Sequence, residues 1–158
     1  SRRASPCPSA PSCSAILAGG EVLDFIGDAV LGVFPIGAQS LDKAVAQALS
    51  AADESRNRLK AINADPALPH VLKAGIALSV GSVMFGNIGV PHRLTFSVIG
   101  QTVHAAARIE SLTKTVGADV LMTEDVARFA SERSKPAGSF ELNGFTDPQP
   151  LFTLDRLF

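Results

Sequence analysis

The chain has 158 residues, of which 46% are hydrophobic and 18% charged, and these values indicate a single globular domain. The formal net charge is −1 and no block of Lys or Arg occurs, which argues against nucleic-acid binding by bulk electrostatics. No apolar run in the sequence approaches the roughly 18 residues that a membrane-spanning helix needs.

Residues 1–14, SRRASPCPSAPSCS, are rich in Ser, Pro and Ala and have no apolar period, so we expect a disordered tail. Cys7 and Cys13 lack the spacing and the His partners of a zinc site. The segment also lacks the apolar stretch of a signal peptide. Because cysteine is scarce elsewhere, we expect a reducing, cytoplasmic compartment for the domain formed by residues 15–158.

A β-hairpin is predicted where two apolar runs, residues 22–26 and 29–34, flank Gly27 and Asp28. The carboxylate of Asp28 would then lie at the tip of a rigid turn, where it could bind a metal ion. Aspartate is also common in turns because its side chain hydrogen-bonds the nearby backbone. The hairpin alone therefore leaves a purely structural role for Asp28 open.

The middle of the chain predicts a long helix followed by short strands. Ser40 can cap a helix that runs to about Asn63, and residues 72–80 alternate in the manner of a strand. Gly81 and Ser82 should turn the chain into a second strand over residues 83–85. A loop is expected over residues 86–92, because Gly and Pro are frequent there.

The rest of the chain predicts strands and helices in alternation. The expected strands cover residues 96–99, 120–122, 140–142 and 151–154, and the expected helices cover residues 102–116 and 124–130. Strands joined by hairpins, with helices on one face, indicate an α+β fold.

His104 and Arg108 lie four residues apart and should share one face of the helix that follows Gly100. Free backbone N–H groups at a helix start favour anions, and the arginine fork suits phosphate oxygens. Arg108 could instead pair with an acid such as Glu110, and His104 could be an ordinary surface histidine. This segment alone leaves both interpretations open.

The chain resembles the class III adenylate/guanylate cyclase catalytic domain over about residues 19–154. The resemblance rests on GGEVLDFIGDAVLGVFP, LKAGIALSVGSVMFGNIG, FSVIGQTVHAAARIESL and ELNGFTDPQPLFTL, in this order. It implies a ferredoxin-like α+β fold, with an antiparallel-rich sheet and helices packed on one face. The family's first strand, which carries the first metal aspartate, and the two helices after it have no counterpart here, so we expect a partial domain.

The resemblance also implies an activity, the conversion of ATP or GTP to the cyclic nucleotide and pyrophosphate for intracellular signalling. Two Mg²⁺ or Mn²⁺ ions are expected, at composite active sites of a homodimer. Asp28 matches a metal-binding aspartate, and Arg108 matches the arginine that stabilises charge in the transition state. The backbone of Phe25 and Gly27 should help to hold the metal and the phosphates.

Four positions depart from the family pattern. Asp24 stands where a purine-reading Lys is usual, Ser97 where Asp or Thr is usual, His104 where Asn is usual and Asn143 where a phosphate-binding Lys is usual. Asp24 and Ser97 could together accept a hydrogen bond from the adenine amino group, so ATP is favoured over GTP. The same departures leave open a catalytically degenerate cyclase-homology domain that dimerises or senses a nucleotide.

Overall fold

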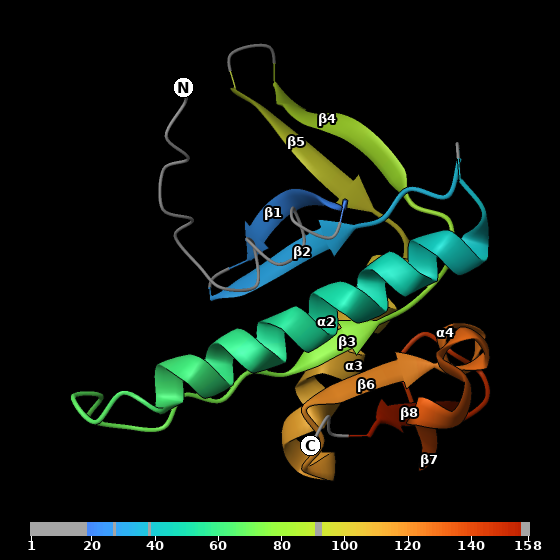
Figure 1. Cartoon of the computed structure of the whole chain (residues 1–158). Helices are drawn as coiled ribbons and strands as arrows, with labels where there is room; N and C mark the ends of the chain where they lie inside the picture. The colour runs from blue at the N-terminus through green and yellow to red at the C-terminus, as the bar shows by residue number, and fades with distance from the viewer. Residues whose placement is uncertain (1–18, 27, 38, 91–92, 156–158) are drawn as a thin grey trace. The chain divides into compact units, whose positions relative to one another are not determined.

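The structure, a computed structural model, describes residues 19–26, 28–37, 39–90 and 93–155 (Figure 1). The chain divides into two compact units, residues 1–74 and residues 75–158. The predicted tail lies outside the described residues. Within the described part of the chain, no helix combines the length and the apolar character needed to cross a membrane.

The first unit contains the predicted hairpin, which the structure confirms. β1 (Glu21–Ile26) pairs antiparallel with β2 (Ala29–Val33), and Ile26 opposite Ala29 closes the ladder around a two-residue turn. The register shifts between Val22 and Asp24, which marks an irregularity of the kind that bends a strand. The hairpin therefore presents residue 28 at its tip.

The same unit contains α2 (Leu41–Asn63), as predicted. Small and branched apolar residues along one side of this helix are buried, namely Ala44, Val45, Leu49, Ala51 and Ala52. Ser40 occupies the N-cap position, but its hydroxyl makes no capping bond to the backbone of the helix. It donates instead to the carboxylate of Asp42, which lowers the pKa of that group.

We expect Ser40→Ala to raise the pKa of Asp42 towards its ordinary value, because the hydroxyl favours the ionised form. The native pKa lies below the unfolded one, so the stabilisation is complete above the unfolded pKa and is lost as the pH falls through the native value. An NMR titration of Asp42 measures this shift. The control is Ser55→Ala, since Ser55 donates to Ala51 O on the same helix; an unchanged Asp42 pKa in Ser40→Ala would contradict the assignment.

The second unit is built around a four-stranded sheet of order β3-β6-β8-β7. β3 (Ile76–Leu78) is parallel to β6 (Val120–Thr123), whereas β8 (Gln149–Leu154) is antiparallel to β6 and to β7 (Ser134–Phe140). α3 (Gln101–Val116) contacts β3 and β6, and α4 (Glu124–Ala130) contacts β6 and β8 before the short 3-10 turn Ser131–Arg133. This antiparallel-rich arrangement with helices confirms the α+β class.

A separate two-stranded ribbon, β4 (Met84–Val90) and β5 (Arg93–Ile99), precedes α3. The prediction of a loop over residues 86–92 was wrong over most of its length, because β4 pairs with β5 continuously from Met84 opposite Ile99 to Val90 opposite Arg93. Glycines in this stretch are typical of loops and led to that prediction. Strand pairing, however, uses the backbone N–H and C=O groups, and glycine has both.

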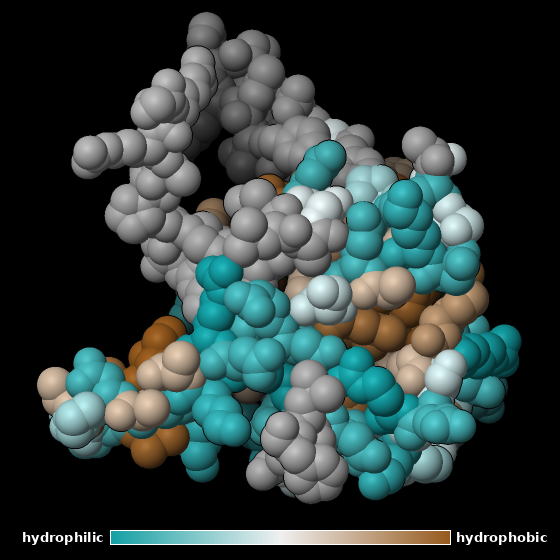
Figure 2. All heavy atoms as spheres, in the orientation of Figure 1, coloured by the Kyte–Doolittle hydropathy of each residue, from teal (hydrophilic) through white to brown (hydrophobic). Residues whose placement is uncertain are grey.

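The strand predicted for residues 72–80 is also shorter than expected, because only Ile76–Leu78 finds a partner strand. Leu72 is held in a loop instead: its N–H donates to Asn63 Oδ1 at 2.8 Å, and its carbonyl accepts from Asn63 Nδ2 at 2.8 Å. Hydrophobic residues reach the surface around this segment, where Val71 is 71% exposed (Figure 2). At the other end of the chain, the strand predicted for 140–142 was wrong over most of its length, because β7 runs from Ser134 to Phe140 and Leu142 lies in the turn that follows.

The core of the second unit lies between α3 and the sheet. Ile109 and Leu121 are completely buried and pack with Leu142 and Leu151. Partly buried residues surround this cluster, among them Phe140 and Phe145. The core therefore anchors one face of α3 and the loop that joins β7 to β8, and these two elements carry the residues considered next.

Candidate functional site

The hairpin of the first unit carries four of the predicted site residues, and the structure describes three of them. Asp28 is exposed in the turn, and Phe25, two residues before Gly27, is 55% exposed. Asp24 is half-buried, and its Oδ1 accepts a hydrogen bond from the backbone N–H of Phe25 at 2.8 Å. One oxygen of Asp24 is thus used locally. Gly27 lies outside the described residues.

The hairpin offers one side chain that could coordinate a hard cation. The exposed carboxylate of Asp28 supplies the oxygen donors that Mg²⁺ and Mn²⁺ prefer. No group of three or more His, Cys, Asp or Glu side chains that could hold a metal occurs among the residues the structure covers. Mg²⁺ is usually held by one or two carboxylates together with substrate phosphates, so the single carboxylate of Asp28 fits part of such a site.

In the second unit, α3 begins immediately after Gly100, close to the loop before β4. A Cβ atom on Gly100 would lie 3.2 Å from the Ser82 carbonyl oxygen, and Thr102 Oγ1 donates to the same oxygen at 3.1 Å. The hydrogen bond from Thr102 holds the start of the helix against Ser82, and Gly100 leaves room for this close approach. His104 is exposed one turn further on, and Arg108 is half-buried one turn after that, so both lie on the side of α3 away from Ile109.

Asn143 lies in a tight turn between β7 and β8. The Phe145 N–H donates to the Leu142 carbonyl oxygen at 2.9 Å, and Gly144 has a φ of +94°. A positive φ at the third residue is typical of a type II turn, which favours glycine there. Leu142 is 5% exposed and belongs to the core, so the turn is anchored while the exposed Asn143 stands at its tip.

The structure brings Arg108 and this turn together. A Cβ atom on Gly144 would lie 3.3 Å from Arg108 Nη1, so the guanidinium rests beside the open side of the glycine. Gln101 Nε2 also donates to the Gly144 carbonyl oxygen at 3.1 Å. The turn borders a polar hollow of about 310 Å³ lined by residues 141–148. Arg108 therefore lies beside the turn that bears Asn143, and the hollow next to this turn also has the acids Glu141 and Asp147 in its lining.

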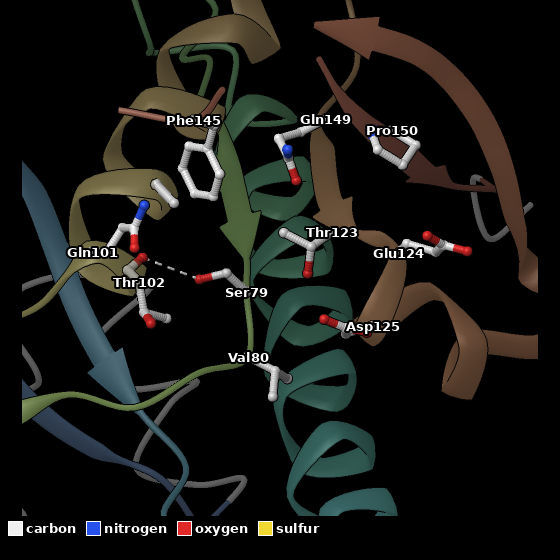
Figure 3. Close-up of a pocket in the computed structure, with 11 residues that line it drawn as sticks. Ser79, Val80, Gln101, Thr102, Thr123, Glu124, Asp125, Phe145, Gln149 and Pro150 are labelled. Carbon is white, nitrogen blue, oxygen red and sulfur yellow. Dashed lines mark hydrogen bonds between the residues drawn. The ribbon is translucent and has the colours of Figure 1, made fainter. Parts of the chain in front are cut away.

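Gln101 also lines a second cavity of about 230 Å³, which lies where β3 ends and where α3, α4 and β8 begin (Figure 3). The side chains of Phe145 and Gln149 border it, and Ser79 Oγ donates to the Thr102 carbonyl oxygen at 3.4 Å. None of the site residues predicted from the sequence lines this cavity. Sequence reasoning missed Gln101 and Gly144, although the Asn-Gly pair at 143–144 is a recognisable turn signal.

Ser97 lies on β5 opposite Gly86 of β4. Its side chain is outside what the structure describes, so its predicted role in reading the base stays a prediction. The same holds for the roles of Asp24, Phe25 and His104, whose positions are known and whose ligands are not part of the structure.

No family model matches the sequence. A curated adenylate cyclase of Anabaena cylindrica is 35% identical to the chain over 114 residues, which is 70% of this chain and 22% of that protein. The structure of a bacterial light-regulated adenylyl cyclase superposes with a TM-score of 0.78 at 25% identity, over 92% of this chain and 42% of that one. The chain belongs to the class III nucleotide cyclases.

The class III cyclase fold recurs in the crystal structure of the guanylyl cyclase Cya2. That structure is 24% identical and has a TM-score of 0.73, over 91% of this chain and 74% of that one. Adenylyl and guanylyl cyclases thus share the architecture of this domain. The chain spans only about a fifth of the length of the Anabaena cyclase.

Proposed function

We propose that this class III cyclase domain converts ATP to cyclic AMP and pyrophosphate, as a homodimer with composite active sites, in intracellular signalling. The observation that carries the proposal is the placement of Arg108 beside the turn that bears Asn143. A guanidinium cation beside a turn with an exposed amide side chain suits a triphosphate. The 35% identity to an adenylate cyclase supports the same conclusion.

The chemistry is an intramolecular substitution at phosphorus. The ribose 3′-oxygen forms a bond to the α-phosphorus, the bond from the α-phosphorus to the bridging oxygen breaks, and pyrophosphate leaves. The 3′-hydroxyl proton passes to solvent. Negative charge shifts onto the phosphate oxygens during this step, and the half-buried guanidinium of Arg108 would stabilise it. His104, one turn earlier on the same face, can donate a further hydrogen bond.

Asp28 would hold a divalent cation together with the phosphates, and the backbone of Phe25 and Gly27 would support them. Mg²⁺ or Mn²⁺, when bound, stabilises the attacking and leaving oxygens. Two ions are expected in a complete site, and Asp28 supplies the carboxylate ligand of one of them in this chain.

The preference for ATP rests on Asp24 and Ser97. An ionised Asp only accepts hydrogen bonds, and the adenine amino group is a donor, whereas guanine presents a carbonyl oxygen at the equivalent position. Asp24 already accepts the Phe25 N–H with one oxygen, so its other oxygen is the one that would bind the base.

A second candidate is a nucleotide-binding domain without turnover, and Asn143 is the observation that favours it. An amide at the tip of the turn contributes hydrogen bonds but no charge, so a nucleotide could bind while the transition state is stabilised less.

One experiment separates the two candidates: the purified chain is incubated with Mn²⁺ and either ATP or GTP, and the cyclic product is quantified. We expect cyclic AMP to form faster than cyclic GMP. In parallel, thermal unfolding is followed with ATP, with and without Mn²⁺. If ATP raises the unfolding temperature without Mn²⁺ and no cyclic product forms, the enzyme proposal is wrong and the nucleotide-sensing domain is supported.

A further inference from the structure

Gln101 and Arg108 approach the same glycine from one helix. They are seven residues apart, which is close to two full turns of α3, so their side chains leave the same face. Gln101 Nε2 donates to the Gly144 carbonyl oxygen across 43 residues of sequence, and Arg108 Nη1 lies 3.3 Å from the position that a Cβ atom on Gly144 would occupy. The turn is therefore held against α3 by the hydrogen bond from Gln101, and Arg108 lies next to the same glycine two helical turns further on.

Gly144 meets two separate demands. Its φ of +94° is strained for any residue with a side chain, and a Cβ atom would lie 3.3 Å from the guanidinium, which is closer than ordinary contact. An arginine side chain has many rotamers, and holding it in one place costs conformational entropy when nothing packs against it. The bare backbone at Gly144 offers a surface on which the guanidinium can rest.

We propose that Gln101 and Gly144 are positioning residues for Arg108. Gln101 holds the Leu142–Phe145 turn against α3, and Gly144 leaves the space in which the guanidinium stays aligned next to Asn143. The part of this inference that concerns turnover rests on the proposed cyclase function. The part that concerns the placement of Arg108 does not, and the two are tested by different measurements.

The placement is tested on the full chain by NMR of the Arg108 Nε–H group. Gln101→Ala and Gly144→Ala are expected to shift this signal. The matched control is Gly117→Ala, because Gly117 also has a positive φ, +73°, but a Cβ atom there would meet nothing within 4 Å. The proposal would be overturned if the Arg108 signal stayed unchanged in Gln101→Ala. It would also be overturned if the signal shifted by the same amount in Gly117→Ala.

Turnover is tested with the same variants. Loss of one neutral hydrogen bond should reduce kcat of Gln101→Ala roughly fivefold, with KM nearly unchanged, since a displaced arginine weakens transition-state stabilisation more than substrate binding. A rise in KM at constant kcat would overturn the positioning role. If the Arg108 signal shifts as expected and the unaltered chain forms no cyclic nucleotide, the proposed function fails and the placement of Arg108 stands.

Discussion

Arg108→Ala is expected to reduce cyclic AMP formation about 100-fold or more, while the affinity for ATP changes far less. The reason is that the guanidinium acts on charge that develops at the α-phosphate, so its loss is felt in the transition state. Arg108 is half-buried beside Gly144, and a partly desolvated charge that is already in place interacts more strongly than one in bulk water. The measurement is kcat and KM for ATP at saturating Mn²⁺.

The control for this prediction is Arg128→Ala. Arg128 is an exposed arginine of α4 whose guanidinium pairs with Glu124 at 3.4 Å and with Asp125 at 3.8 Å on the same helix. Such solvated pairs contribute little, so turnover should be unchanged. Equal losses in kcat and in ATP affinity for Arg108→Ala would indicate that the arginine binds the ground state only.

Asp28→Ala is expected to abolish metal-dependent turnover while changing the free energy of unfolding little. Asp28 is exposed in a turn, so its removal deletes few contacts, whereas a hard cation loses its carboxylate ligand. The sharper variant is Asp28→Asn, because Asn suits turns equally well but has no negative charge. Both variants are compared by Mn²⁺ titration of turnover and by thermal unfolding.

Glu21→Ala serves as the control on the same hairpin, since Glu21 is also an exposed acid, at the start of β1. It should leave the Mn²⁺ dependence unaltered. If Asp28→Asn unfolds the domain, or keeps full turnover at low Mn²⁺, then Asp28 is a structural turn residue and the metal assignment is wrong.

Features encoded by short-range patterns were predictable from the sequence. The β1–β2 hairpin follows from two apolar runs around a Gly-Asp pair. α3 follows from a regular apolar stripe that ends just before Gly117, and Gly117 has the left-handed conformation that is common after a helix. The strands β4 and β5 were underestimated because their glycines mimic loop signals, and β3 was overestimated because alternation alone does not provide a partner strand.

The contacts around Arg108 could not be predicted in the same way. The candidate residue was identified from its spacing to His104 and from the family resemblance, but the Gln101–Gly144 hydrogen bond joins residues 43 positions apart. Only the packing of Leu142 and Phe145 onto the core brings the turn to the helix. Pairwise contacts of this kind depend on the tertiary fold, and no local periodicity records them.

The most direct test of the central claim is the identity of the product. The purified chain is mixed with ATP and Mn²⁺, and cyclic AMP and pyrophosphate are quantified together. A cyclase domain predicts equal amounts of the two products, formation that depends on Arg108, and unchanged formation in Arg128→Ala. Release of ADP and inorganic phosphate instead, or product that persists in full in Arg108→Ala, would contradict the account.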